Sequence, residues 1–285
     1  MVSGQSDINS LRLDTSRRAI VVQNHLVAQS FYEPAGDDKY LSGDWTRGPW
    51  GSDSQHGGPP AALLGRAVEQ TIADDEMQVV RVAFDLFGPV PVAPLELRTE
   101  VVRPGKRVRL VTAELHSSGE VIMRATAWCI RTETVDLPPQ PEIMPPPPPD
   151  SAHAPEYFRG GEPSYLAAMD IRFVSGDFFE PGPAVTWMRA KIPLLPDEPL
   201  SPLGRVLCAS DSGSGVSAQL DFSKWLFINP NLDVHVSRLP EGDWVCLDAR
   251  TVVEQHGVGL AATVIFDEKG HVGRGLQSLL VGPLR

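Results

Sequence analysis

The sequence predicts an α+β fold made of two similar modules, each with a central helix wrapped by an antiparallel sheet. Three observations support this prediction. A helix-like segment followed by several strand-like runs occurs twice along the chain. These runs alternate apolar and polar residues, which is the pattern of strands with one buried face. A proline-rich segment divides the chain into halves of similar size.

The composition is that of an ordinary globular protein, and it narrows the possible partners. The chain has 285 residues, 42% of them hydrophobic, and a net charge of −11. Such an acidic chain is poorly suited to nucleic acid, whose phosphates need an excess of Lys and Arg. No apolar run approaches the roughly 20 residues of a membrane-spanning helix, and the first residues lack the apolar segment of a signal peptide. We therefore expect a cytoplasmic protein with no membrane span and no nucleic-acid partner.

Cysteine and histidine usage gives no sign of a metal or redox site. Cys129, Cys208 and Cys246 each lie among apolar neighbours, where a buried thiol acts as a small hydrophobic residue. No histidine and acidic residues show metal-ligand spacing, and no glycine-rich segment fits a dinucleotide-binding pattern. The sequence thus predicts neither a metal nor a cofactor.

The proline-rich segment DLPPQPEIMPPPPPDSAHAPE, residues 136–156, predicts the boundary between the modules. Its prolines lack backbone donors and favour extended polyproline II conformation, so no helix or central strand can absorb them. We expect an N-terminal module over residues 1–135, a linker over 136–160 and a C-terminal module over 161–285.

In the first half, a helix is predicted from about Pro59 to Ile72, with proline in its first turn and an apolar face. Turn residues such as Pro104-Gly105 and Ser118-Gly119 separate the strand-like runs that follow it. The predicted strands lie within residues 77–90, 93–105, 106–119 and 120–133.

The second half repeats this order. A helix is predicted over residues 201–211, with Ser201 as N-cap and Pro202 at its first position. Strand-like runs follow within residues 225–240, 243–255, 258–270 and 271–282. Leu64-Gly65-Arg66 in the first helix matches Leu203-Gly204-Arg205 in the second, which indicates a duplicated module. Two such modules can pair into one continuous sheet and remove an exposed edge from each.

The order of short motifs resembles that of the TesB-like acyl-CoA thioesterases, especially their actinobacterial branch. The matching residues are Trp50, His56-Gly57-Gly58, Ala61-Ala62-Leu63-Leu64, Ala67 and Glu69. The resemblance implies a double hotdog fold, an acyl-CoA substrate, hydrolysis to free acid and CoA without a cofactor, and a role in fatty acid metabolism. It also implies assembly into a homo-oligomer, although a double hotdog already mimics a dimer within one chain.

The same resemblance implies a catalytic site at Asp211, Asn229 and Gln277. Members of the family commonly carry Ser or Thr where Asn229 stands, but an amide can also hold a water. Asp211 would activate that water, and Asn229 and Gln277 would position it. Gln277 is the most telling of the three, because an amide in an apolar strand is costly unless it is paired. Asp211 and Asn229 also suit turns, the latter because Pro230 follows it.

The histidine and two glycines before the first helix are assigned to the substrate rather than to the chemistry. His56, Gly57 and Gly58 form the turn that leads into the helix, and the glycines allow a close approach of backbone or substrate. A backbone N–H at such a turn can stabilise a developing oxyanion.

Two other functions stay open from the sequence. An enoyl-thioester hydratase on the same fold pairs Asp and His in a D-x-N-P-[LIV]-H arrangement, but INPNLDVH has these letters in another order. A module that binds acyl-CoA or another lipid without turnover is the third possibility, and the change to Asn229 keeps it open. Release of free thiol from acyl-CoA distinguishes hydrolysis from binding.

Overall fold

The structure is a computed structural model, and it describes residues 29–156 and 162–284. The start of the predicted N-terminal module (1–28), the end of the predicted linker with residue 161 (157–161) and Arg285 lie outside the described residues. The strands are β1 (Tyr32–Pro34), β2 (Lys39–Ser42), β3 (Met77–Leu86), β4 (Pro94–Arg103), β5 (Val108–Ser117), β6 (Glu120–Arg131), β7 (Met169–Asp177), β8 (Glu180–Ala190), β9 (Trp225–Ile228), β10 (Asn231–Val236), β11 (Val245–Val253), β12 (Val258–Asp267) and β13 (Gly270–Pro283). The helices are η2 (Asp44–Thr46), α2 (Gly58–Ile72), η3 (Pro149–Ser151), α3 (Tyr165–Ala168), α4 (Pro202–Ser210) and α5 (Gly213–Val216).

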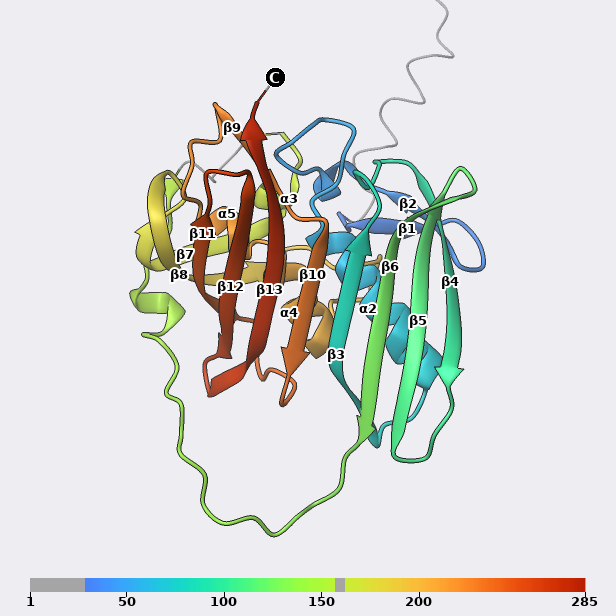
Figure 1. Cartoon of the computed structure of the whole chain (residues 1–285). Coiled ribbons are helices and arrows are strands. Elements are labelled where there is room, and N and C mark those ends of the chain that lie inside the picture. Colours follow the sequence, from blue (N-terminus) through green and yellow to red (C-terminus); the bar gives the residue numbers. More distant parts are fainter. Residues whose placement is uncertain (1–28, 157–161, 285) are drawn as a thin grey trace, which may run out of the picture.

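Within the described residues, all strands belong to one 13-stranded antiparallel sheet (Figure 1). Its order is β1-β2-β4-β5-β6-β3-β10-β13-β12-β11-β8-β7, with β9 paired to β13. The two halves of the chain meet where β3 pairs with β10, and Val82 lies opposite Val234 there. The predicted α+β fold with a continuous antiparallel sheet is therefore confirmed.

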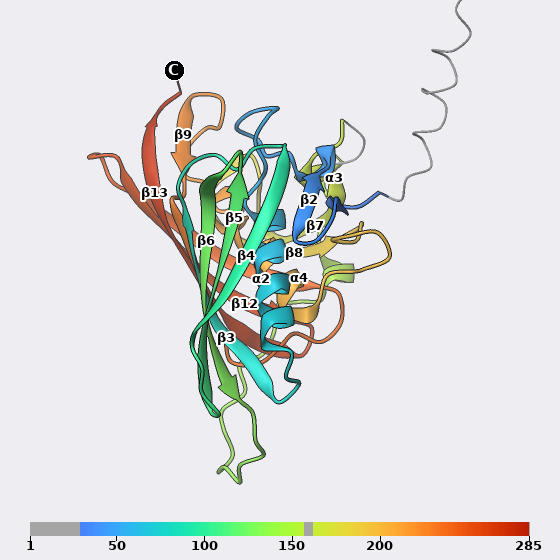
Figure 2. The ribbon, with the colours of Figure 1, turned by 90° about the vertical axis from the view of Figure 1, so that its right-hand side faces the viewer.

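The two long helices lie side by side against the concave face of this sheet (Figure 2). They run antiparallel, since Gly58 at the start of α2 meets Cys208 near the end of α4, and Glu69 near the end of α2 meets Ser201 before α4. Leu64 and Leu207 are completely buried between helices and sheet. This packing brings the start of the first helix to the end of the second.

Local capping chemistry explains where the helices begin. The Ser201 hydroxyl accepts a hydrogen bond from the Gly204 N–H over 2.9 Å, and Pro202 is the first helical residue of α4. The same hydroxyl donates to Glu69 Oε2 over 2.7 Å, and Arg66 of α2 donates to Glu198 over 2.8 Å. These contacts confirm the predicted N-cap and fasten this end of the helix pair.

The run predicted as a strand over residues 225–240 contains two strands, β9 and β10. Asn229 and Pro230 lie between them, and Pro230 has no N–H to offer a ladder. Among the described strands, β9 pairs only with β13, whereas β10 pairs with both β13 and β3. The break turns Asn229 out of the sheet ladder.

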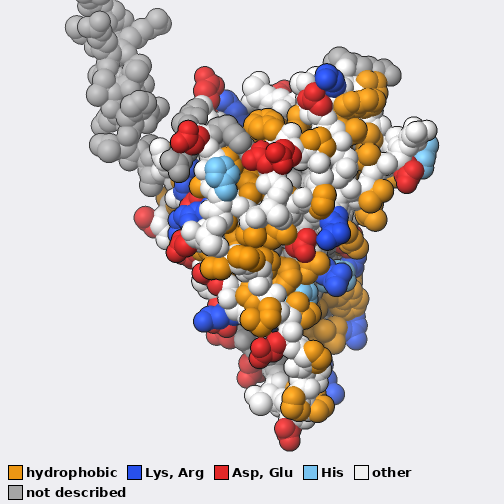
Figure 3. Space-filling view, turned by 90° about the vertical axis from the view of Figure 1, so that its left-hand side faces the viewer, with side chains coloured by type: hydrophobic (Ala, Val, Ile, Leu, Met, Phe, Trp, Pro, Cys, Tyr) orange, Lys and Arg blue, Asp and Glu red, His pale blue; other side chains and the backbone are white. Residues whose placement is uncertain are grey.

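The proline-rich segment is held against the second half of the chain. The indole of Trp187 donates to the Pro147 carbonyl over 2.7 Å, and Arg172 donates to the Pro149 carbonyl over 3.2 Å. Figure 3 looks onto this side of the molecule, where hydrophobic side chains run down the middle of the surface between charged ones. The segment therefore covers part of the sheet that would otherwise face water.

Candidate active site

The site forms where the start of α2 meets the end of α4, and two glycines make that approach possible. A Cβ on Gly58 would lie 2.3 Å from the Cys208 carbonyl oxygen, and a Cβ on Gly57 would lie 2.7 Å from Asp211 Oδ2. No larger residue fits at either position without moving α4 or the carboxylate. Gly57 lines the cavity described below, whereas Gly58 packs against α4.

Asp211 directly follows the last residue of α4, and its carboxylate is held by two amides. Oδ1 accepts a hydrogen bond from Asn229 Nδ2 over 3.0 Å and another from Gln277 Nε2 over 3.3 Å. Only 8% of Asp211 is exposed. A buried carboxylate needs such partners, since desolvation without them is costly.

Gln277 uses its whole amide to hold this end of α4. Nε2 also donates to the Asp211 carbonyl over 3.1 Å, and Oε1 accepts from the Ser214 N–H over 3.0 Å. The residue is 2% exposed and is not among the described residues that line the cavity. The cost of burying this amide is thus offset by contacts within the protein.

Asn229 lies at the break between β9 and β10, where it lines the cavity. Its amide nitrogen donates to Asp211 and also to the Asn231 carbonyl over 3.2 Å. Both hydrogens of the amide are therefore used. Its carbonyl oxygen accepts from no described residue and is free to accept from a ligand or water.

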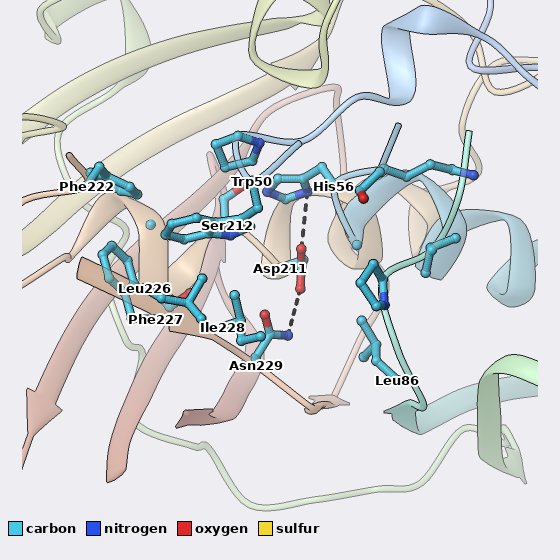
Figure 4. Close-up of a pocket in the computed structure, with 18 of the residues that line it drawn as sticks. Trp50, His56, Leu86, Asp211, Ser212, Phe222, Leu226, Phe227, Ile228 and Asn229 are labelled. Atoms are coloured by element: carbon cyan, nitrogen blue, oxygen red, sulfur yellow. Dashed lines mark hydrogen bonds and ion pairs between the residues drawn. The ribbon is translucent and has the colours of Figure 1, made fainter. Parts of the chain in front are cut away.

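His56 lies on the other side of the Asp211 carboxylate (Figure 4). Its Nδ1 accepts a hydrogen bond from the Gly58 N–H over 3.0 Å and lies 3.2 Å from Asp211 Oδ2. The ring stacks on Tyr165 of α3, with the ring centres 3.7 Å apart. Burial lowers the pKa of His56, although the charge of Asp211 acts in the opposite direction.

A cavity of about 440 Å³ opens beside these residues. Among the described residues that line it, Asp211 and His56 carry the only titratable side chains. The remainder is mainly apolar and comes from both halves of the chain: Leu86, Phe87, Val90, Leu166, Ile171, Phe178, Met188, Val216, Phe222, Leu226, Phe227, Ile228 and Leu280. Across the described residues, no group of three His, Cys, Asp or Glu side chains could hold a metal ion.

Two family models match the chain. The one described as the acyl-CoA thioesterase N-terminal domain matches residues 46–130, and the one described as the acyl-CoA thioesterase C-terminal domain matches residues 138–281. The chain belongs to the acyl-CoA thioesterase family. The resemblance inferred from the short motifs is confirmed, and so is the enzyme class, a thioester hydrolase acting on acyl-CoA.

Solved structures share the fold of this thioesterase at low sequence identity. A candidate thioesterase II from Thermobifida fusca has a TM-score of 0.71 at 18% identity, covering 88% of this chain and 95% of its own. A hot dog fold protein from Alicyclobacillus acidocaldarius has a TM-score of 0.66 at 17% identity, covering 89% and 96%. The acyl-CoA thioesterase II TesB2 from Mycobacterium marinum has a TM-score of 0.61 at 18% identity, covering 89% and 96%. These likenesses confirm the double hotdog fold.

A search of curated protein sequences finds no match to this thioesterase. Within residues 29–156 and 162–284, no helix combines the length and the apolar character needed to cross a bilayer.

An aromatic wall of the thioesterase cavity was not foreseen from the sequence. Trp50 lies edge-on to Phe227, with ring centres 5.2 Å apart, and Phe222 stacks on Phe178 at 4.8 Å. Trp50 and Phe178 are distant in sequence from each other and from Phe222 and Phe227, so no local pattern joins all four. Tyr165 was missed for the same reason, because its contact with His56 depends on the packing of α3.

Proposed function

We propose that this thioesterase hydrolyses acyl-CoA thioesters with an apolar, fatty acyl group, using a water that Asp211 activates. The observation that carries the proposal is a buried carboxylate, held by Asn229 and Gln277, at the wall of an apolar cavity. The cavity wall offers no cation to pair with a charged acyl group among the described residues. An uncharged hydrocarbon chain therefore suits it best.

In the proposed reaction, Asp211 takes a proton from the water as the water oxygen attacks the thioester carbonyl carbon. The carbon–sulfur bond of the resulting intermediate then breaks, and the sulfur leaves with the bonding electrons. The CoA thiolate takes the proton that Asp211 accepted, which restores the carboxylate, and the acyl group leaves as the free acid. A thiolate is a good leaving group, so a strong general acid is not needed.

Asn229 and Gln277 have different parts in this proposal. The free side-chain carbonyl oxygen of Asn229 accepts a hydrogen bond from the water. This contact orients a lone pair of the water oxygen toward the thioester carbonyl carbon. Gln277, expected from the sequence to touch the water, has no free polar atom, so we assign it to positioning Asp211.

The turn before α2 binds the thioester in this proposal. Gly57 lines the cavity, and its N–H donates to no described residue. This donor can therefore face the thioester carbonyl oxygen at the positive end of the helix dipole. Gly58 contributes by letting α4 and Asp211 approach, and the side chain of His56 is taken up in the next subsection.

Free-thiol release from acyl-CoAs of increasing chain length tests the proposal. We expect Asp211→Asn to lower kcat by at least about 100-fold, the usual contribution of a general base. Glu100→Gln, an equivalent change on an exposed strand position, is the control and should match the unaltered enzyme. Full activity of Asp211→Asn would disprove the site. Saturable binding of acyl-CoA by the unaltered protein without thiol release would instead identify a binding protein.

We also propose that the two modules, residues 1–135 and 161–285 joined by the linker 136–160, act as one catalytic unit. His56 and Gly57 come from the first module, and Asp211, Asn229 and Gln277 come from the second. The helix contact and the β3–β10 pairing hold these groups together. Each half expressed alone should show no thioesterase activity, and activity in either half would contradict the proposal.

Finally, we propose that the enzyme works in the cytoplasm as a homo-oligomer. Its three cysteines are free and buried, as is usual for proteins of a reducing compartment.

Exposed apolar side chains lie next to one another on β11, β12 and β13, where Val252 faces Leu260 and Val258 faces Leu280. A second copy of the chain could cover this stripe. Light scattering should give a mass above one chain, and Leu260→Lys should reduce it.

A further inference from the structure

The first turn of α2 has few backbone donors, and one of them is given to His56. Pro59 and Pro60 have no N–H. The Gly58 N–H donates to His56 Nδ1 over 3.0 Å. The side chain of His56 thus serves as the acceptor that the start of this helix would otherwise lack.

This hydrogen bond determines which nitrogen of the ring carries the proton. Because Nδ1 accepts from a backbone N–H, its lone pair must be free, and the proton of the neutral ring lies on Nε2. Asp211 Oδ2 lies 3.2 Å from Nδ1, but only the contact with Gly58 has hydrogen-bond geometry. Burial lowers the pKa of His56 against the opposing charge of Asp211, which favours the neutral ring.

The remaining titratable groups around His56 keep their protons near neutral pH. Tyr165 stacks on the ring from α3, and Cys208 lies near Asp211 on α4. Burial raises the pKa of both the phenol and the thiol well above their ordinary values. Asp211 is therefore the group whose charge acts on His56.

The other ring nitrogen reaches the cavity. His56 lines the cavity wall, and its Nε2 bonds to no described residue. Although Nε2 has no partner among the described residues, it is not one of their fully buried unpaired polar atoms, so part of its surface is accessible from the cavity. A neutral imidazole held at a helix N-terminus through one nitrogen can polarise a carbonyl group with the other.

We propose that His56 is a catalytic residue of the hydrolysis, whose neutral ring donates its Nε2–H to the thioester carbonyl oxygen beside the Gly57 N–H. This inference rests on the function proposed above. The two donors stabilise the negative charge that develops on this oxygen when water attacks, and no proton leaves the ring. The role differs from simple substrate binding, because the interaction strengthens in the transition state.

Two substitutions separate the cavity-facing nitrogen from the helix-facing one. His56→Asn keeps an acceptor for the Gly58 N–H but has no donor at the position of Nε2. His56→Gln can place an amide N–H near the position of Nε2 but loses the acceptor. We expect His56→Asn to fold with nearly unchanged stability and to lose kcat by about 100- to 1,000-fold at similar KM. His56→Gln should recover part of kcat despite lower stability. Normal kcat in His56→Asn would overturn the proposal.

Nitrogen NMR of the imidazole tests the same inference without turnover. We expect Nε2 protonated and Nδ1 unprotonated between pH 6 and 9, while a proton on Nδ1 in this range would overturn the proposal. If the unaltered enzyme hydrolyses no acyl-CoA, the proposed function fails, and the NMR result still decides whether His56 presents its donor to the cavity. If hydrolysis occurs and His56→Asn is fully active, only the role of His56 fails.

Discussion

Asn229 Nδ2 donates a hydrogen bond to Asp211 Oδ1 over 3.0 Å, on the side of the carboxylate away from His56. A hydrogen bond to a charged group contributes about 1.5–3 kcal/mol, and each 1.4 kcal/mol in the transition state is about tenfold in rate. We therefore expect Asn229→Ala to lower kcat by about 10- to 100-fold. Asn229→Asp should be worse, because it sets a second negative charge beside the first.

The control for this prediction is Asn231→Ala. Asn231 lies two residues further along, and its side chain accepts from the Ser278 N–H rather than touching Asp211. Its kcat should remain within about twofold of the unaltered enzyme. Steady-state thiol release measures all three variants, and equal losses in both alanine variants would contradict a specific role for Asn229.

Gly57→Ala should reduce activity far more than stability. The backbone at Gly57 has φ −68° and ψ −15°, which alanine adopts without strain. However, the new Cβ would lie 2.7 Å from Asp211 Oδ2 and must push the carboxylate aside. We expect a loss of kcat of at least about 100-fold, since displacement of a reacting group by about 1 Å is that costly.

Gly282→Ala provides the comparison for Gly57→Ala, because a Cβ there meets no atom within 4 Å. Both variants should unfold within about 1 kcal/mol of the unaltered protein in urea. Retention of normal activity by Gly57→Ala would show that the carboxylate has room to move.

Gln277→Met should lower both stability and activity. Methionine matches the shape of glutamine, but it leaves the Ser214 N–H without its acceptor and removes one of the two amide donors to the Asp211 carboxylate. A buried donor without a partner costs about 1–3 kcal/mol of unfolding free energy. The free energy of unfolding, measured with urea, and kcat should both decrease. An unchanged kcat would rule out a positioning role for Gln277.

The free energy of unfolding should fall when the pH drops from 7.5 to 5.5. Burial lowers the pKa of His56 and, with Arg274 and Arg238, that of His271. Above about pH 6.5 both rings are neutral whether the chain is folded or not, so they do not affect stability. Below about pH 6.5, the two histidines bind protons in the unfolded chain but stay neutral in the folded one. This lowers the free energy of unfolding by up to about 1 kcal/mol per histidine.

Urea unfolding of His56→Asn and His271→Asn at the two pH values checks this prediction. Each variant should lose less stability on acidification than the unaltered protein does, and the double variant least of all. An equal loss in all four proteins would place the acid sensitivity elsewhere.

The sequence predicted the parts of the fold that depend on local chemistry. Ser201 and Pro202 mark the start of α4 because a hydroxyl acceptor and a fixed φ suit that position in any helix. The alternation of apolar residues predicted the strands, although the run at 225–240 hid the break at Asn229 and Pro230.

The contacts that make the site were beyond such patterns. The approach of His56 to Asp211 depends on antiparallel packing of two helices that are distant in sequence, and no local signal specifies their register. The role of Gln277 changed for a similar reason. The sequence indicated that its amide must be paired, but only the fold shows that Asp211 and Ser214 take up all of it.

Because α2 and α4 are antiparallel, each end of the helix pair contains the start of one helix and the end of the other. The two ends nevertheless have different roles. At one end, Gly57 and Gly58 leave space next to a carboxylate, and the Gly57 N–H donates to no described residue. At the other end, Ser201 and Glu69 bond to each other and Arg66 closes on Glu198. The first end is therefore open to a substrate, while the contacts at the second end hold the two helices in the register that places His56 beside Asp211.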